Sequence, residues 1–337
     1  MTNDSMTASF LFIQKILKIS GIVFACCIFW IGCGKKTGSE IRIGAMKGPT
    51  TIGLLHLMEE AKEGNTENAY AFTMAAGADE LTPLLAKGEL DIALVPANVA
   101  AILYQKTGGG ICVIDINTLG VLYMVSADEG VEGAADLRGK TIYLTGRGTT
   151  PDYVLQYLLS QNGIGMDEVT LEYRSEATEV AALLAENPKA LGLLPQPFAA
   201  MACAKNDNLA LCFSMTEEWD KVQVGEGSRL VTGVTVVRRA FLLEHPEAVE
   251  MFLNEHAESA AYTADNQAET ARLCAEAGII ADEQAAMQAI PFCGITCITG
   301  EEMKRALGGY LAVLYDKNPE SVGGILPDDD FYYGVKE

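Results

Sequence analysis

The chain is predicted to be an α/β protein with two doubly wound lobes that are joined by two hinge crossings. Two observations predict this fold class. From Ile41 onward short apolar runs alternate with amphipathic stretches, a pattern typical of βα units with parallel strands. The series then restarts after Asp136, and a long β-branched run at residues 231–237 is followed almost only by helical patterns. The chain therefore returns to its first lobe after building a second.

The first lobe is predicted to begin with a strand at residues 41–45 and a helix at residues 51–62. Leu54, Leu55 and Met58 share one face of that helix. Gly88 ends a later helix, because glycine is favoured just past a helix end. The remaining elements predicted here are strands at 70–74, 91–95, 111–116 and 122–126 and helices at 79–87 and 98–106.

The second lobe repeats the alternation of strands and helices. Its predicted strands are 141–145, 170–173, 191–194 and 209–213, and its helices are 151–161, 177–186 and 197–205. The closing helices are expected at 246–266, 268–278, 281–289 and 301–316, after the strand at 231–237. We place the crossings near 126–128 and 230–233. Lobe one is then 41–126 plus 234–337, and lobe two with its return hinge is 127–233.

Cys33 indicates how the protein is attached to a membrane. An apolar run at residues 19–32 follows Lys15 and Lys18, a small residue precedes Cys33, and a polar tether follows it to residue 40. This layout is that of a bacterial lipoprotein signal peptide at residues 1–32. The run is shorter than the roughly 20 apolar residues that span a bilayer. We expect cleavage before Cys33, its lipidation with palmitate as one acyl chain, and a domain anchored on the outer face of the cytoplasmic membrane. A plain signal peptide and an uncleaved anchor are the alternatives.

The composition excludes several classes of partner. Lys and Arg number 24 against 45 Asp and Glu, a net charge of −21. Nucleic-acid binding needs clustered basic residues, and so does electrostatic binding to anionic lipid. Neither is expected, so the membrane attachment must be covalent.

Six cysteines follow Cys33, and their pairing is left open by the sequence. Buried free thiols are favoured over disulfides. The six are Cys112, Cys203, Cys212, Cys274, Cys293 and Cys297. A zinc site is not expected, because the mature part has no CxxC pair and the three histidines show no ligand spacing with the cysteines.

Five loops at the carboxyl ends of predicted strands carry the candidate binding residues. In open α/β sheets ligands bind at these ends, where helix N-termini offer free N–H groups to an anion. The loops hold small residues, hydroxyls and amides, and Gly146-Arg147-Gly148-Thr149-Thr150-Pro151 is the most distinctive of them. Ordinary helix capping would explain any one loop alone. The predicted ligand-binding residues are Lys47, Thr50, Thr51, Gly77, Ala78, Asn98, Arg147, Thr149, Thr150, Tyr153 and Gln196.

Catalytic and cofactor motifs are not found. Gly146-x-Gly148 and the run at 108–110 lack the third glycine of a dinucleotide fingerprint, and no GxSxG, HExxH or SxxK with partners occurs. Paired acids such as Glu217-Glu218 are assigned to the solvated surface. No cofactor, metal or catalytic residue is expected.

The stretches at 41–48, 84–93, 136–142, 146–153 and 245–249 together resemble the solute-binding lipoproteins of ABC importers. The similar group includes the nitrate, sulfonate and thiamine-precursor binding proteins. The resemblance covers nearly everything after Ile41 and is carried by Lys87-Gly88-Glu89-Leu90-Asp91 and Leu137-Arg138-Gly139-Lys140, in that order behind the lipoprotein signal.

This resemblance implies a type II periplasmic-binding fold that closes over its ligand by hinge motion. It also implies delivery of the ligand to a membrane permease driven by a cytoplasmic ATPase. Fungal thiamine-pyrimidine synthases share the fold as enzymes and carry a cysteine-rich motif. Here the only Cys-Cys pair, Cys26-Cys27, lies inside the signal, so an enzyme is not expected. A ligand-sensing or adhesive surface lipoprotein is the alternative function.

The ligand itself stays open between two chemistries. Arg147 or Lys47 would pair with an anion such as a sulfonate or nitrate. Tyr153, Tyr123 and Phe198 would instead stack on a flat heterocycle such as a thiamine precursor.

Overall fold

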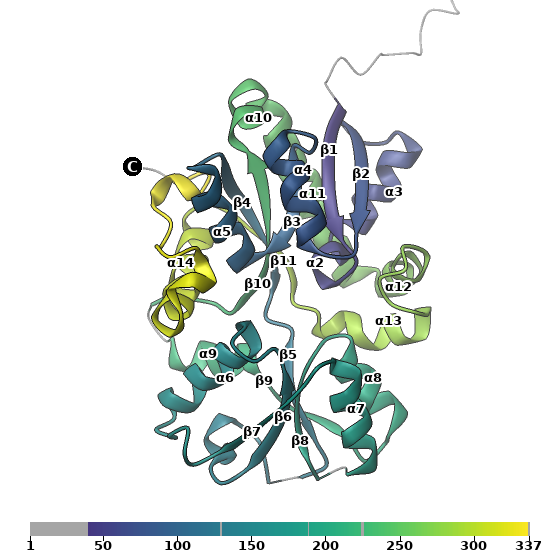
Figure 1. Ribbon diagram of the computed structural model, residues 1–337. Coiled ribbons are helices and arrows are strands. Elements are labelled where there is room, and N and C mark those ends of the chain that lie inside the picture. Colours follow the sequence, from purple (N-terminus) through teal and green to yellow (C-terminus); the bar gives the residue numbers. More distant parts are fainter. Residues whose placement is uncertain (1–39, 129, 188, 224–225, 336–337) are drawn as a thin grey trace, which may run out of the picture. The chain divides into compact units, whose positions relative to one another are not determined.

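The computed structural model describes residues 40–128, 130–187, 189–223 and 226–335 (Figure 1). The predicted signal peptide, Cys33 and the residues of the tether before Glu40 lie outside the described residues. Among the residues described, none of the helices combines the length and the apolarity that a membrane crossing requires.

The first sheet has six strands in the order β11-β4-β10-β3-β1-β2. Their bounds are β1 (Glu40–Met46), β2 (Ala69–Ala75), β3 (Ile92–Pro96), β4 (Ile111–Leu119), β10 (Val231–Arg238) and β11 (Ile295–Ile298). β1 pairs parallel with β2 and β3, whereas β10 is antiparallel to β3 and β4. The sheet is therefore mixed rather than wholly parallel. The carboxyl ends of β1 to β4 lie at one edge, and β10 begins there.

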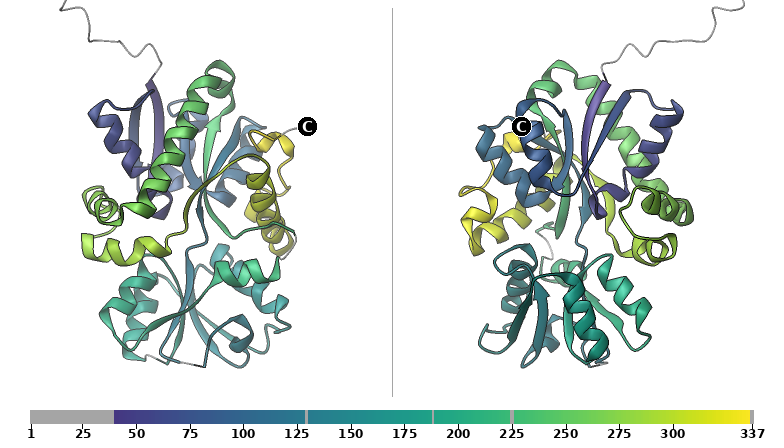
Figure 2. Two further views of the ribbon diagram at one scale, coloured as in Figure 1. Left: turned by 180° about the vertical axis from the view of Figure 1, so that it is seen from behind. Right: turned by 45° about the vertical axis from the view of Figure 1, so that its right-hand side comes forward.

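The first lobe also contains helices, several of which cover the two faces of this sheet. They are α2 (Pro49–Ile52), α3 (Leu55–Glu63), α4 (Ala78–Lys87), α5 (Ala97–Thr107), α10 (Arg239–Glu244), α11 (Pro246–Asp265), α12 (Gln267–Glu276), α13 (Glu283–Ala289) and α14 (Gly300–Lys317). Figure 1 shows α4 and α5 in front of the sheet, and the reverse view in Figure 2 shows α11 in front. Strands covered on both faces bury nearly all their side chains, which explains the continuous apolar run of β3. β4 is equally buried but carries the polar residues Asp115, Asn117 and Thr118 in its second half.

The helix predicted at 51–62 is two helices, α2 and α3, with Gly53 between them. A Cβ atom at Gly53 would lie 2.9 Å from Cγ2 of Ile295 in β11. The missing side chain lets the break between α2 and α3 approach β11. The prediction missed both the break and β11, because the apolar spacing of one helical face continues across Gly53.

The second sheet has five strands in the order β7-β6-β8-β5-β9. Its elements are β5 (Leu122–Ser126), β6 (Thr141–Thr145), β7 (Thr170–Arg174), β8 (Leu191–Pro195) and β9 (Ala210–Ser214), with α6 (Thr150–Gln161), α7 (Ala177–Glu186), α8 (Phe198–Lys205) and α9 (Met215–Val222). β6 is parallel to β7 and β8, and β5 is antiparallel to β8 and β9. The carboxyl ends of β6, β7, β8 and β9 consequently share an edge.

The chain leaves the first sheet one strand earlier than the sequence analysis placed the crossing. β5 was assigned to lobe one, yet it pairs with β8 and β9 in the second sheet. The crossing is therefore at Gly120 and Val121, between β4 and β5, rather than at 126–128. A Cβ atom at Gly120 would lie 2.3 Å from Oγ1 of Thr216, so only glycine fits this passage. Two apolar strands separated by two residues look like neighbours in one sheet, which is why the prediction erred.

The chain returns to the first sheet between α9 and β10, and this segment packs against α14. Trp219 of α9 is fully buried, its Nε1 donates to Ser228 Oγ at 3.2 Å, and its ring meets that of Tyr310 edge-on at 5.8 Å. A Cβ atom added at Gly309 of α14 would lie 2.5 Å from Cβ of Ser228, so the missing side chain of Gly309 leaves room for Ser228. The last helix is thus packed directly on the segment that carries the chain back into the first sheet.

Candidate functional site

The first part of the candidate site is the loop between β1 and α2, at the carboxyl edge of the first sheet. Thr51 Oγ1 donates to the carbonyl of Met46 at 2.5 Å, which fixes the start of α2 on the end of β1. Thr50 is 5% exposed, and its Oγ1 has no hydrogen-bond partner among the described residues. Buried polar atoms are nearly always paired, so an unpaired hydroxyl at a strand end is a candidate ligand contact.

Gly233 brings β10 close to this loop. A Cβ atom at Gly233 would lie 2.4 Å from Cγ2 of Thr50 and 2.5 Å from Oδ1 of Asn117. Both distances are below van der Waals contact. Asn117 lies near the end of β4, and Thr118 Oγ1 donates to its Oδ1 at 2.9 Å. Thr50, Asn117 and Gly233 therefore form one close-packed group at the edge, of which the sequence analysis named only Thr50.

The other residues predicted in the first lobe are placed less favourably for a ligand. Asn98 is half-buried, and its Nδ2 donates to the carbonyl of Ser321 at 3.4 Å. Gly77 and Ala78 stand at the start of α4, where a Cβ atom on Gly77 would touch Oδ1 of Asp79 at 2.6 Å. Lys47 is exposed, and its Nζ lies close to Gly278 after α12.

The loop before α6 is already occupied by a carboxylate of the chain itself. Asp152 is 3% exposed and accepts hydrogen bonds from Gly148 N at 2.8 Å, Gln156 Nε2 at 2.7 Å and Tyr173 OH at 2.8 Å. Thr149 Oγ1 donates to the carbonyl of Gly146 at 2.6 Å. An anionic ligand at this helix start would meet the charge of Asp152, so the expected anion site at the N-terminus of α6 is disfavoured.

The remaining predicted residues of α6 join the two lobes. Asn318 Nδ2, just after α14, donates to Tyr153 OH at 2.9 Å, and Thr150 hydrogen-bonds to Tyr310 of α14. Arg147 is exposed, with its guanidinium 4.2 Å from the ring centre of Tyr173. This cation–π contact leaves the N–H edges of Arg147 open to solvent or to a ligand.

Gln196 is the second buried residue with an unpaired polar atom at a strand end. It follows β8, is 2% exposed, and its Oε1 accepts from Ala200 N at 3.2 Å. Its Nε2 has no partner among the described residues. Thr216, which follows β9 at the same edge, also has an unpaired hydroxyl. The sequence analysis missed Thr216, although its position after a strand would have singled it out.

The helices that follow these loops are packed together across the two lobes. Ile52 of α2 and Ala200 of α8 belong to one apolar cluster, which they share with residues of α12 and α13. Tyr123 of β5 meets Phe292 edge-on at 5.8 Å. Phe198 instead lines an apolar hollow of about 220 Å³ between α7 and α8.

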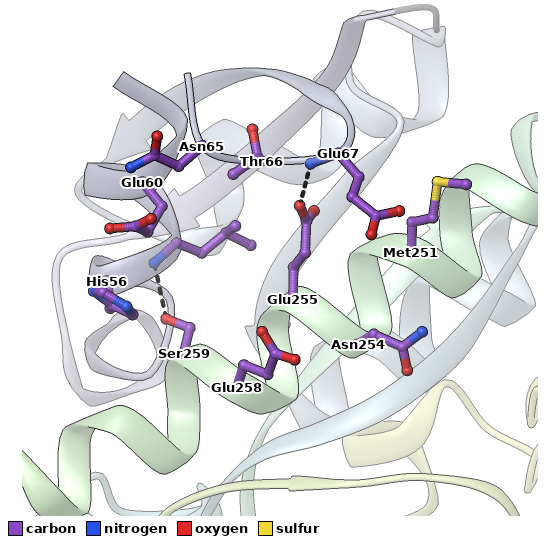
Figure 3. A pocket seen from close by; sticks show the side chains of 11 residues that line it. His56, Glu60, Asn65, Thr66, Glu67, Met251, Asn254, Glu255, Glu258 and Ser259 are labelled. Carbon is purple, nitrogen blue, oxygen red and sulfur yellow. Dashed lines mark hydrogen bonds between the residues drawn. The ribbon is translucent and has the colours of Figure 1, made fainter. Parts of the chain in front are cut away.

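A separate pocket of about 240 Å³ opens between α3 and α11 (Figure 3). The carboxylates of Glu60, Glu67, Glu255 and Glu258 surround it, and Glu255 accepts hydrogen bonds from Glu67 N at 2.6 Å and from Tyr70 OH. None of its lining residues is among the predicted ligand-binding residues. Its carboxylates would repel an anion.

Within the described part of the chain, the six cysteines at positions 112–297 form no disulfide. Burial raises the pKa of Cys112 and of Cys203 to about 11, and that of Cys274 and of Cys293 to about 12. Thiols of this kind are neutral at physiological pH, and they are poor nucleophiles.

Two mixed sheets and a chain that crosses twice between them match the two-lobed fold of periplasmic binding proteins. A family model described as NMT1/THI5 like matches residues 69–270. The chain therefore belongs to the NMT1/THI5-like family. None of the curated proteins matches it in sequence.

Several solved structures share the fold of this chain. An ABC transporter protein from Parabacteroides distasonis has a TM-score of 0.71 and 25% identity, over 87% of this chain and 98% of that one. The aliphatic sulphonate binding protein SsuA from Escherichia coli has a TM-score of 0.66 and 13% identity, over 86% and 91%. The alkanesulfonate-binding protein SsuA from Xanthomonas axonopodis, bound to MOPS, has a TM-score of 0.58 and 14% identity, over 88% and 98%. The predicted fold class is confirmed.

Proposed function

We propose that the protein is the extracytoplasmic solute-binding component of an ABC importer. It captures a small polar organic ligand between the two lobes and delivers it to a membrane permease. The observation that carries this proposal is the pair of buried, unpartnered polar atoms, Thr50 Oγ1 and Gln196 Nε2, at strand ends of different sheets. Family membership and the transport proteins among the structural neighbours support it.

The chemistry of these two groups favours a ligand with neutral hydrogen-bonding atoms. A hydroxyl and an amide N–H recognise carbonyl, sulfonyl or ring-nitrogen acceptors without supplying charge. A ligand that carries negative charge would reach Arg147 at the rim, where the guanidinium is exposed. A sulfonate-like anion and a thiamine-precursor-like heterocycle both satisfy this arrangement, provided that the charged group stays away from Asp152.

Thermal unfolding of the full-length protein tests the proposal. The panel comprises alkanesulfonates, nitrate, bicarbonate, pyrimidines, flavins and amino acids. A ligand at 100 times its Kd should stabilise the protein by about 2.7 kcal/mol, a shift of several degrees. Thr50→Val and Gln196→Leu should each weaken ligand binding by about tenfold or more. In each variant an apolar side chain would leave a polar atom of the ligand buried without a hydrogen-bond partner.

The double variant Lys47→Ala/Arg147→Ala tests whether the ligand is negatively charged. It should weaken the binding of an anion, whereas a neutral heterocycle should bind as it does to the wild type. Folded protein that no member of the panel stabilises would count against solute capture and would favour the sensor or adhesin.

We further propose that Cys33 carries the lipid that holds the domain at the outer face of the membrane. Cells that make the wild-type protein should incorporate labelled palmitate into it, and the Cys33→Ala variant should not be labelled. The Cys26→Ala variant controls for the other cysteines of the leader and should be labelled like the wild type. Equal labelling of wild type and Cys33→Ala would overturn this assignment.

A further inference from the structure

Three side chains that can bind a metal ion meet beneath α11. Asp115 comes from β4, His256 from α11 and Cys297 from β11, and their ligand atoms all lie within 4.8 Å of one another. His256 Nδ1 is 3.1 Å from Asp115 Oδ2. The cluster contains neither Thr50 nor Gln196, and the proposed function makes no use of it.

A line of hydrogen bonds orients the carboxylate. Asn117 Nδ2 donates to Thr235 Oγ1 at 3.1 Å, and Thr235 Oγ1 donates to Asp115 Oδ1 at 2.8 Å. Since Thr235 donates to one oxygen, the other, Oδ2, is left to face His256. Partners of this kind fix the direction of a metal-binding carboxylate and are typical of metal sites.

The charge of Asp115 is the strongest reason to expect a cation here. Asp115 and His256 are both fully buried, and within the described part of the chain Asp115 forms no ion pair with lysine or arginine. A buried carboxylate is costly unless a positive charge compensates it, and a bound metal ion would supply that charge.

We propose that Asp115, His256 and Cys297 bind a zinc ion. One carboxylate, one thiolate and one neutral imidazole balance the charge of Zn²⁺ to zero, as a buried site requires. Zinc takes ligands of these three types at about 2.0–2.3 Å. Two tetrahedral ligands at such lengths lie roughly 3.3 Å apart, close to the separation between Nδ1 and Oδ2. On binding, the thiol releases its proton to solvent and the imidazole keeps its proton on Nε2.

The bound zinc would hold β11 on the sheet. β11 is a four-residue edge strand that pairs with β4 at two positions, with an irregular register between them. Cys297 is its only metal ligand, while Asp115 belongs to the neighbouring strand and His256 to the helix above. The three protein ligands leave one tetrahedral position to a water molecule or a small anion.

A metal titration of the full-length protein, first freed of metal with a chelator, tests this site. Zn²⁺ should bind in competition with a fluorescent zinc indicator. Co²⁺ should give a tetrahedral spectrum with a charge-transfer band from the Cys297 thiolate. Cys297→Ser should abolish that band and weaken zinc binding by about tenfold or more. Cys212→Ser, which changes a half-buried cysteine in the second lobe, should leave both unchanged.

The spectrum of the wild-type protein decides the question even if a variant fails to fold. An octahedral cobalt spectrum without a thiolate band would overturn the proposal and would assign the ion to carboxylates such as those in Figure 3. Zinc binding that is unchanged in Cys297→Ser would overturn it as well. Neither outcome depends on the transported ligand, so a failure here would leave the proposed solute-binding function intact.

Discussion

Replacing Asp91 by alanine is expected to lower the free energy of unfolding by about 3 kcal/mol. The Asp91 side chain is 3% exposed and precedes β3. It accepts from Arg42 Nε at 2.8 Å, Arg42 Nη2 at 2.6 Å and Arg42 N at 3.1 Å, and from Arg238 Nη2 at 3.0 Å. One carboxylate thereby connects β1, β3 and β10. This loss of stability is at the low end of the range for removing one partner of a buried ion pair, because 40% of the Arg42 side chain is exposed.

Urea unfolding followed by circular dichroism measures this loss. Asp91→Asn keeps the size of the side chain and some of its hydrogen bonds, so it should lose less than the alanine variant. Glu59→Ala removes a surface pair with Lys62 and should change the midpoint little. An alanine variant as stable as the wild type would show that the two arginines find other partners.

The pH dependence of the same pair has a definite sign. Burial alone would raise the pKa of Asp91, but the hydrogen bonds from Arg42 and Arg238 outweigh it and hold the pKa below its ordinary value. Such a group stabilises the folded state above its unfolded pKa of about 3.9. That contribution is lost as the pH falls through the lower pKa of the folded state. Asp91→Asn should therefore remove this part of the acid destabilisation.

Much of the fold follows from apolar patterning, and the exceptions have physical causes. β3 and the first half of β4 are buried on both faces, and their sequences are unbroken apolar runs. β11 has the mixed sequence Ile-Thr-Cys-Ile and only partial burial, so no pattern distinguishes it from a loop. The sheet to which β5 belongs is decided by its partners β8 and β9, which follow it in the chain by more than sixty residues.

Residues of the candidate site can be predicted from the sequence only where their position relative to a predicted strand or helix points to a binding role. Thr50 and Gln196 were predicted because each lies in a short stretch between the end of a predicted strand and the following predicted helix. His256 and Cys297 were dismissed as ligands, because they are far apart in sequence and neither sits in a short metal motif. The fold brings them together with Asp115 from a third element. Likewise, no pattern shows that Asp152 turns back onto Gly148 and fills the loop where an anion was expected.

Gly233→Ala is expected to abolish the stabilisation by ligand while costing about 1–3 kcal/mol of stability. The new Cβ would need space held by Thr50 and Asn117, at 2.4 and 2.5 Å. Asn117 is held by hydrogen bonds with Thr235 and Thr118, whereas the Thr50 hydroxyl has no partner among the residues that the structure describes. Thr50 should therefore move first, and the start of α2 would move with it. The thermal shift with the identified ligand, compared with that of the wild type, measures the effect.

Gly308→Ala is the matched control, since it adds the same methyl group elsewhere in the first lobe. Its Cβ would lie at an ordinary 3.4 Å from Tyr332 OH, inside α14. Alanine is favoured over glycine within a helix by about 0.5–1 kcal/mol, so stability should rise or stay level and ligand binding should be kept. Adding Thr50→Ser to Gly233→Ala removes the methyl group that clashes but keeps the hydroxyl. It should recover part of the lost ligand response, because the two positions are coupled by direct contact. If Gly233→Ala keeps the full ligand response, the start of α2 is not part of the binding site.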